Sequence, residues 1–286
     1  MKIISIVANN PIFIELQYKT LQKFVVGGDY EYIIFNDGKD FPDLTNFGNI
    51  EEGRAGIVKK CVELDIKCIN IPNSHHIRKT DASVRHSDSL RFVLNYMKSN
   101  LDEYLMLDSD MFLIDHLDLN VYRKHICACV LQERPSLVYL WPNLFYLDMR
   151  RAPNIDRLGL GLLPIGLHVK GDTGSASSIW LKTFNYNFPP CKTINSMMQC
   201  CNRDFYMIKH LSSLSWDDSV LPINIDKNII ELLKADNRNV NGKYFYEIYD
   251  NRILHYRAGT NWMNQNKDLH NQNISRLIEY VTKVIN

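Results

Sequence analysis

The sequence lacks several features that would indicate particular classes of protein. Its 33 basic and 32 acidic residues give a net charge of +1. No basic tail or block of like charge is present, so neither a nucleic acid nor an anionic membrane is expected as the main partner. No apolar run reaches the length of about 18 residues that predicts a transmembrane helix. The short apolar run Ile3–Val7 has neither the length nor the cleavage site of a signal peptide, and we expect a cytoplasmic protein.

Cysteine and repeat patterns are also uninformative. The seven cysteines are an odd number. Neither the adjacent Cys200 and Cys201 nor Cys127 and Cys129 have the spacing of a zinc site or of a disulfide framework, so reduced thiols are expected. Internal repeats, low-complexity segments and linkers are absent. The chain has 286 residues and is 45% hydrophobic, which is enough to bury a sizeable core.

The first third of the sequence alternates strand and helix patterns. Asn10 and Pro11 are typical of a helix start, and Ser83 is a candidate cap for a later helix. This order predicts an α/β fold with a mostly parallel, doubly wound, Rossmann-like sheet. We expect strands at 3–8, 30–35, 66–71 and 104–114, and helices at 11–25, 54–64 and 84–97.

The second half is less regular. Strands are expected at 126–132 and 138–146, and Pro142 indicates an edge strand or a bulge in the second of these. Met198, Cys201, Phe205 and Ile208 have helical spacing. An amphipathic helix is expected at the C-terminus, with Ile274, Leu277, Ile278 and Val281 on its apolar face.

Two carboxylates stand out near the end of the fourth strand, at Asp108 and Asp110. Aspartate is disfavoured in strands, and burying an unpaired carboxylate is costly. In an extended chain, residues i and i+2 point to the same side, so both groups could present oxygens to a divalent cation such as Mg²⁺ or Mn²⁺. The alternative is a turn in which each aspartate caps a backbone amide.

Two other polar segments are expected beside these carboxylates. In doubly wound sheets, ligands bind at the carboxyl ends of the strands. This rule brings 8–10, 36–38 and 108–110 to one edge of the sheet. Their convergence favours a binding site over isolated turns.

At this point the sequence resembles the GT-A-fold glycosyltransferases, which use nucleotide-sugar donors. The Asp108-Ser109-Asp110 motif after a strand is one part of the resemblance. The other is the segment His255–Trp262, which is similar to the His-Gly-Lys-Pro-Trp segment of the glycogenin-like retaining branch. The resemblance implies one GT-A-like domain over 1–286, with a nucleotide-sugar-binding half (1–115) and an acceptor-side, metal-completing half (116–286).

The resemblance also implies roles on the donor side. Asp108, Asp110 and His255 would bind Mn²⁺ or Mg²⁺, with Asp108 on the metal, the ribose or both. The remaining donor contacts would come from residues at the strand ends, on the helix at 84–97 and in the late segment: Ala8, Asn9 and Asp37 for the nucleoside, Ser109 in the motif, and Arg85, Asp88 and Arg257 for phosphate and sugar oxygens. For most of these the alternative is an ordinary turn or a solvated surface pair.

On the acceptor side, Asp172 is the candidate for the carboxylate nearest the anomeric carbon. In an inverting enzyme it would be the general base, and in a retaining enzyme it would orient the sugar. Asp217 and Asp218 form a rival pair. Further candidates lie in the small, polar segment 171–178 or are residues that could line a sugar site: Thr173, Gly174, Trp141, Asn143, Trp180 and Trp262.

The expected reaction is sugar transfer from a nucleoside diphosphate sugar, UDP by the resemblance, to a hydroxyl of a glycan or protein. The resemblance favours retention. A sugar-nucleotide pyrophosphorylase is an alternative, but its glycine- and lysine-rich phosphate loop has no counterpart at Ala8–Pro11. A non-catalytic nucleotide-sugar- or glycan-binding protein is the other. The sequence does not distinguish a monomer from an oligomer.

Overall fold

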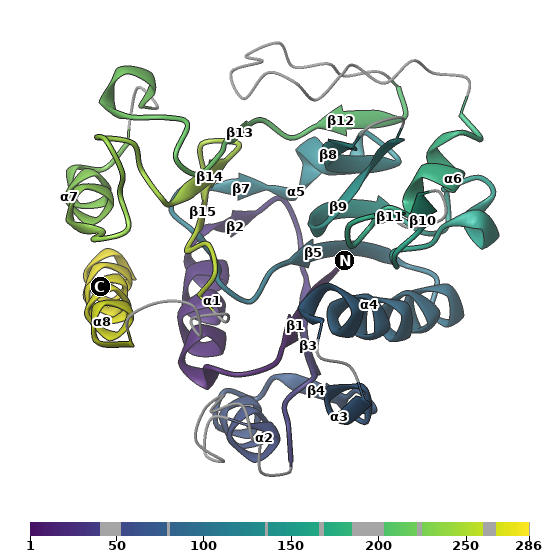
Figure 1. Ribbon diagram of the computed structural model, residues 1–286, viewed down its shortest axis with the longest axis horizontal. Coiled ribbons are helices and arrows are strands. Elements are labelled where there is room, and N and C mark those ends of the chain that lie inside the picture. Colours follow the sequence, from purple (N-terminus) through teal and green to yellow (C-terminus); the bar gives the residue numbers. More distant parts are fainter. Residues whose placement is uncertain are drawn as a thin grey trace.

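A seven-stranded mixed sheet forms the centre of the protein (Figure 1). The computed structural model describes residues 1–40, 53–78, 81–134, 137–165, 169–184, 203–221, 225–259 and 267–285. In spatial order the strands are β12 (Phe205–Met207), β8 (Cys127–Arg134), β9 (Leu137–Asp148), β5 (Glu103–Leu107), β1 (Lys2–Val7), β3 (Glu31–Asn36) and β4 (Lys67–Asn70). Four of the six neighbouring pairs among these strands are parallel, and both antiparallel pairs involve β9. The expected α/β class with a mostly parallel sheet is confirmed.

The parallel strands are buried on both faces because alternate side chains enter different cores. On β1, Ile3 packs with the helices of one face and Ile4 with those of the other. Helices α1 and α2 cover the first face, and α4 and α6 cover the second (Figure 1). Their bounds are α1 (Pro11–Phe24), α2 (Arg54–Glu63), α4 (Ala82–Ser99) and α6 (Ser177–Leu181).

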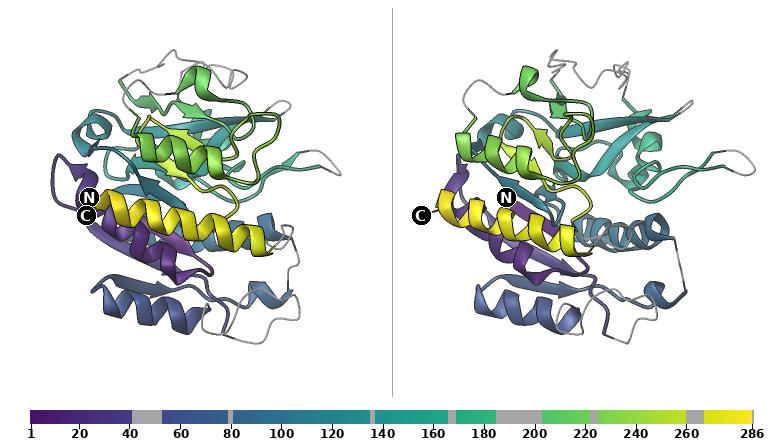
Figure 2. Two further views of the ribbon diagram at one scale, coloured as in Figure 1. Left: turned by 90° about the vertical axis from the view of Figure 1, so that its left-hand side faces the viewer. Right: turned by 60° about the vertical axis from the view of Figure 1, so that its left-hand side comes forward.

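A second, four-stranded sheet lies beside the first. Its strands in spatial order are β13 (His210–Leu211), β14 (Glu247–Tyr249), β15 (Ile253–His255) and β6 (Met111–Leu113). Its apolar side chains form a third core with α1, α7 (Lys227–Ala235) and α8 (Lys267–Ile285). Figure 2 shows α8 lying alongside α1. Since β5 belongs to the first sheet and β6 to the second, the chain passes between the sheets at residues 108–110.

Several short elements complete the described part of the chain. No helix in that part is both long enough and apolar enough to cross a lipid bilayer. The short elements are β2 (Val25–Val26) paired with β7 (Leu117–Asp118), β10 (Pro164–Ile165) paired with β11 (Val169–Lys170), α3 (His75–Arg78), α5 (Leu119–Arg123) and the 3₁₀ helices η2 (Ile155–Arg157) and η3 (Asp218–Val220).

Two helix caps differ from the prediction. Helix α1 begins at Pro11 as expected, but the Asn10 side chain does not cap it. Asn10 has a φ of 53°, and its Nδ2 donates to the Gly259 carbonyl oxygen at 2.9 Å. Helix α4 is capped by Asp81 and not by Ser83, because the Asp81 carboxylate accepts the Ser83 amide at 2.8 Å. A carboxylate is a good acceptor there, since it also meets the positive end of the helix dipole.

The prediction for Pro142 was half correct. Its strand, β9, is an interior strand between β8 and β5, so the edge-strand alternative is wrong. The bulge is confirmed: between the pairs Cys129–Phe145 and Leu131–Leu140, four residues of β9 face one residue of β8. Proline is tolerated at this interior position because the ladder of hydrogen bonds is interrupted there.

The two helices predicted in the second half have different outcomes. The C-terminal one is α8, with Leu277 and Val281 buried. The prediction of the other helix is wrong for its two described residues. Phe205 lies in β12, which pairs with the buried strand β8, and Ile208 directly follows β12. Met198 and Cys201 lie outside the described residues.

Candidate functional site

The motif Asp108-Ser109-Asp110 forms the turn between the two sheets. The Met111 amide donates to the Asp108 carbonyl oxygen at 3.1 Å, which closes the turn. The expected extended geometry is therefore wrong at this point, although the two carboxylates do converge. His255 joins them because β15 pairs with β6, which places His255 directly opposite Met111.

Asp108, Asp110 and His255 together form a cluster that could hold a metal ion. Each offers one atom, and these atoms lie within 4.8 Å of one another. His255 Nε2 lies 3.1 Å from Asp110 Oδ1, and both side chains are about 95% buried, with exposed fractions of 5% and 4%. The same Asp110 oxygen accepts no hydrogen bond of good geometry from the described residues. Two carboxylates and an imidazole suit Mn²⁺, and the unsatisfied oxygen is consistent with a cation between these groups.

The electrostatics of the cluster favour added positive charge. Burial, and then the neighbouring charge of Asp110, raise the pKa of Asp108 to about 7. Burial disfavours protonation of His255, but Asp110 and Glu247 on either side of its ring raise the pKa to about 10. The metal-free cluster thus limits its negative charge by retaining protons. A divalent cation would replace those protons when it binds.

Glu247 orients the imidazole of His255. Strands β14 and β15 form a hairpin in which Glu247 faces His255, and Glu247 Oε2 lies 2.7 Å from His255 Nδ1. The Tyr249 hydroxyl donates to the same oxygen at 2.8 Å, and the Ser213 amide donates to Oε1 at 3.1 Å. A carboxylate on Nδ1 keeps a proton there, so Nε2 is the nitrogen that binds when a metal displaces its proton; this is the usual support for a metal-binding histidine.

Gln17 and Asn143 hold the turn that carries the carboxylates. Gln17, which is 1% exposed on α1, donates from Nε2 to the carbonyl oxygens of Asp108 at 2.8 Å and Met111 at 2.7 Å. Asn143 Nδ2 donates to Asp108 Oδ2 at 2.5 Å. The bulge in β9 carries Asn143, so this irregularity of the strand positions a contact to the motif.

The loop after β15 fixes Asp110 from the other side. The Gly259 amide donates to Asp110 Oδ2 at 2.8 Å, and the Tyr256 amide donates to the Asp110 carbonyl oxygen at 2.9 Å. A Cβ atom at Gly259 would lie 2.9 Å from Asp110 Cβ and 2.7 Å from Tyr256 Cδ1. Only glycine therefore allows the loop to approach Asp110 this closely.

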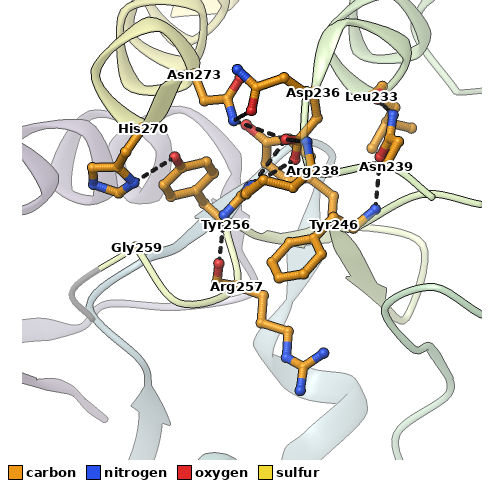
Figure 3. Close-up of polar contacts among 12 residues, drawn as sticks. Leu233, Asp236, Arg238, Asn239, Tyr246, Tyr256, Arg257, Gly259, His270 and Asn273 are labelled. Carbon is orange, nitrogen blue, oxygen red and sulfur yellow. Dashed lines mark hydrogen bonds and ion pairs between the residues drawn. The ribbon is translucent and has the colours of Figure 1, made fainter. Parts of the chain in front are cut away.

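A buried ion pair supports this loop (Figure 3). Arg238 binds Asp236 through two nitrogens, with Nη2 at 2.7 Å from Oδ2 and Nε at 2.9 Å from Oδ1. The same guanidinium lies 4.1 Å from the centre of the Tyr256 ring and donates to the Arg257 carbonyl oxygen at 2.8 Å. Asn273 of α8 donates to Asp236 Oδ1 at 2.8 Å. These contacts connect the backbone next to His255 to α8.

The nucleoside-side candidates lie at the strand ends as expected. Ala8 and Asn9 directly follow β1, and the Asp37 amide donates to the Val7 carbonyl oxygen at 2.8 Å. The Asp37 carboxylate already has partners in the protein. Ser89 Oγ donates to its Oδ2 at 2.7 Å, and two histidines of α3 lie against it.

The other donor-side candidates occupy different environments. Ser109 is buried within the turn, and its amide donates to Asp108 Oδ1 at 2.8 Å. Arg257 is exposed, with its Nε 4.0 Å from Glu247 Oε1. Arg85 and Asp88 lie on α4, where Asp88 pairs with Arg91 at 2.9 Å. The alternative for these two residues was a surface pair with each other, whereas the pair observed for Asp88 is with Arg91.

The aromatic candidates Trp141 and Trp180 lie in different environments. Trp141 lies next to the cluster, with its ring centre 5.8 Å from that of His255 and stacked on Tyr249 at 5.2 Å. Trp180 is fully buried in the core, where its Nε1 donates to the Pro153 carbonyl oxygen, so it cannot line a sugar site. Trp262 lies outside the described residues.

The acceptor-side loop precedes α6. Asp172 pairs with Arg134 at 2.9 Å, and its Oδ1 accepts the Thr173 amide at 2.8 Å. Gly174 has a φ of 90° and packs against the β9 bulge, where an added Cβ would lie 2.5 Å from the Leu140 carbonyl oxygen and 2.7 Å from Pro142 Cδ.

The rival carboxylate pair lies elsewhere in the structure. Asp217 and Asp218 pair with Lys243 and Lys234. Asp217 also caps the 3₁₀ helix η3 through the Ser219 amide. These contacts explain both carboxylates without a ligand.

Another neighbour of the site, His86, has no distinguishing mark in the sequence. Burial lowers the pKa of this α4 residue, and the charges that oppose the shift belong to Asp37, Asp172 and Asp110. His86 therefore lies within electrostatic range of three carboxylates from three separate segments. Its lowered pKa keeps the ring neutral at pH 7.

Two supporting residues could have been recognised only in part from the sequence. Glu247 has a detectable signal, because Asp250 and Asn251 between two apolar runs predict a hairpin that places it opposite His255. Gln17 has no such signal. It lies four residues from both Phe13 and Leu21 on α1, and this spacing indicates only that its side chain is buried.

These features define an α/β protein with a candidate metal centre at the carboxyl edge of its parallel strands. No protein-family model matches the chain, and no curated protein matches it. Among solved structures, it is similar to the galactosyltransferase LgtC in complex with donor and acceptor sugar analogs, with 13% identity, a TM-score of 0.35, and coverage of 55% of this chain and 62% of that chain. An active-site mutant of LgtC gives 14% identity, a TM-score of 0.35, and coverage of 55% and 61%. The chain spans about three fifths of the length of these structures. At these values the likeness carries no argument, and the function proposed next rests on the site and on the sequence motifs described above.

Proposed function

We propose that the protein is a metal-dependent glycosyltransferase that moves a sugar from a nucleoside diphosphate sugar, with UDP as the nucleotide, to a hydroxyl of a glycan or protein. The observation that carries this proposal is the convergence of Asp108, Asp110 and His255 at the carboxyl edge of the parallel strands. That edge is where doubly wound sheets bind their ligands.

The residues have complementary roles in this proposal. Asp108, Asp110 and His255 hold Mn²⁺ or Mg²⁺, which would neutralise the charge that develops on the leaving diphosphate. Glu247 holds a proton on Nδ1 of His255, so that a metal can displace the proton of Nε2 and bind there. Arg257 is exposed beside Glu247 and supplies positive charge toward the diphosphate.

Residues at the same edge of the sheet are assigned to the nucleoside and to the sugar of the donor. Ala8 and Asn9 directly follow β1 and belong to the nucleoside side, together with Asp37, and Arg85 and Asp88 on α4 belong to the sugar side. Trp141 presents a large aromatic surface next to His255 and suits the apolar face of a sugar.

Asp172 is assigned to the anomeric centre. In the retaining reaction, which the family resemblance favours, its carboxylate orients the donor sugar. In an inverting reaction it would remove the proton of the acceptor hydroxyl. Its pairing with Arg134 holds the carboxylate in one orientation.

The proposal is tested by a panel of nucleoside diphosphate sugars with Mn²⁺. Binding should raise the melting temperature, by an amount that grows with the logarithm of ligand concentration over Kd. The preferred donor should also release nucleoside diphosphate with Mn²⁺ and not with EDTA. The variant Asp110→Asn should lose this release while keeping its fold, and Asp29→Asn, at an exposed aspartate, should keep it.

Two outcomes would contradict the proposal. Nucleoside triphosphate formed from pyrophosphate would indicate a pyrophosphorylase. Donor binding without turnover for any acceptor or water would indicate a binding protein.

A further inference from the structure

A second cluster of metal-ligating side chains lies on the other side of β1. Asp37 directly follows β3, and His75 and His76 open helix α3. All three side chains are buried, with exposed fractions of 6%, 8% and 6%. Each offers one possible ligand atom within 4.8 Å of the others. Buried histidine and aspartate side chains so close together require either full hydrogen bonding or a bound ion.

A nitrogen of each histidine lies close to the Asp37 carboxylate. His75 Nε2 lies 3.0 Å from Asp37 Oδ1, and His76 Nε2 lies 3.3 Å from Asp37 Oδ2. In tetrahedral zinc sites, bonds of about 2.0–2.1 Å place neighbouring ligand atoms about 3.3 Å apart. Neither His75 Nε2 nor Asp37 Oδ1 has a hydrogen bond of good geometry with a described residue, although the two atoms nearly touch. Both atoms are therefore available to a bound ion.

The remaining contacts are compatible with a bound ion. Ser89 Oγ donates to Asp37 Oδ2 at 2.7 Å, which leaves Oδ1 as a single ligand oxygen with its partner oxygen hydrogen-bonded. His76 Nε2 also lies 2.8 Å from the Asp37 carbonyl oxygen. In the metal-free protein His76 can donate from Nε2 to that oxygen. Metal binding through Nε2 would require the proton of the neutral ring to move to Nδ1, which has no hydrogen-bond partner among the described residues.

The second cluster is distinct from the first. Strand β1 lies between β3, which leads to Asp37, and β5, which leads to Asp108. Neighbouring strands are about 4.8 Å apart, so the two clusters are separated by about 10 Å along the sheet edge. One ion cannot serve both.

We propose that Asp37, His75 and His76 form a zinc site separate from the catalytic metal centre. Two imidazoles and one carboxylate are a ligand set that zinc accepts readily, and three protein ligands leave one position for water. The ion connects the end of β3 to α3. It also means that the Asp37 carboxylate serves the nucleoside side by organising this edge of the sheet, not by contacting the nucleoside itself.

The experiment measures zinc in protein that carries no polyhistidine tag. Protein dialysed against EDTA is titrated with Zn²⁺ by calorimetry, and metal content is measured by mass spectrometry after excess zinc is removed. The background variant is Asp110→Asn, which disables the first cluster. We expect about one zinc ion per chain in this background.

Combining Asp110→Asn with His75→Asn and His76→Asn should weaken zinc binding at least a hundredfold, since two of three ligands are lost. The matched control combines Asp110→Asn with His116→Asn and His125→Asn, which lie outside both clusters and should leave binding unchanged.

Asp37→Asn provides a second variant if the double histidine substitution disturbs folding, which circular dichroism would report. It should reduce zinc affinity at least tenfold with the histidines in place. The proposal is overturned if the Asp110→Asn background binds no zinc, or if the His75 and His76 substitutions leave binding intact. The first result would show a hydrogen-bonded Asp–His cluster without an ion.

Discussion

Replacing Glu247 tests whether a residue that contacts a candidate metal ligand, and not the metal itself, affects metal affinity. Glu247 lies 2.7 Å from His255 Nδ1, and its pKa is lowered to about 2 even though burial opposes this, because His255 is its partner. Loss of such an outer carboxylate typically reduces metal affinity 10- to 100-fold, which corresponds to about 1.4–2.7 kcal/mol. Glu247→Gln keeps an acceptor oxygen and loses the charge, so we expect the lower end. Glu247→Ala loses both, and we expect about a hundredfold.

The assay is the Mn²⁺ dissociation constant, measured by calorimetry or by the electron paramagnetic resonance signal of free Mn²⁺. Glu231→Gln, at an exposed position on α7, is the control and should change nothing. Circular dichroism confirms that each variant is folded. If Glu247→Ala is folded and binds Mn²⁺ within twofold of the original protein, the carboxylate does not support the metal ligand and the reasoning is refuted.

Three further predictions follow from the contacts around the site. Gln17→Leu removes the side-chain donor from two buried carbonyl oxygens, although the Asp108 oxygen keeps the Met111 amide, so it should lower the free energy of unfolding by about 1–3 kcal/mol in urea denaturation. No loss would mean that the turn does not depend on this side chain. Gly259→Ala should displace Asp110 and weaken Mn²⁺ binding on the order of tenfold, whereas Gly161→Ala, where no atom lies within 4 Å of the added Cβ, should not. Burial, and then the charge of Arg238, lower the pKa of His270 to about 4, so folding favours its neutral form. The contribution of neutral His270 to stability is complete above the unfolded pKa of about 6.5 and is lost as the pH falls toward 4. Between pH 7 and 4.5 this loss is about 2 kcal/mol, and it should be absent in His270→Gln. Equal losses in both proteins would contradict the lowered pKa of His270.

The elements around the parallel strands could be predicted because local patterns and tertiary packing agree there. Ile3 and Ile4 enter opposite cores, so β1 has to be apolar on both faces, and its sequence reads as a buried strand. Helix α4 was predicted from the spacing of Leu90, Val93 and Met97, all of which are buried. Its cap was misassigned because Asp81 and Ser83 both suit the position, and only the backbone geometry distinguishes them.

The second half was harder because distant pairing determines its structure. Phe205 belongs to a strand only because β8 lies beside it, and helical spacing over four residues carries no information about that neighbour. Pro142 indicated an irregularity correctly, but whether a strand lies at the edge depends on what pairs with its far side. Such partners come from distant parts of the chain.

The candidate site could also be predicted only in part. The candidate ligands Asp108, Asp110 and His255 could be proposed because their chemistry is unusual where they occur. Their geometry was misjudged, since the two aspartates converge through a turn and not along an extended strand. The supporting Gln17 and Glu247 are ordinary residues in isolation and acquire a role only through contacts with other elements.

The position of the motif between two sheets has a consequence for local unfolding. Strand β5 belongs to the seven-stranded sheet, while β6 and β15 belong to the four-stranded one. A cation shared by Asp108, Asp110 and His255 would act as a non-covalent cross-link between them. Amide hydrogens of β14 and β15 should then exchange more slowly with Mn²⁺ than with EDTA, and those of β1 and β3 should exchange equally in both. A metal ion at this site would thus also determine how independently the smaller sheet opens.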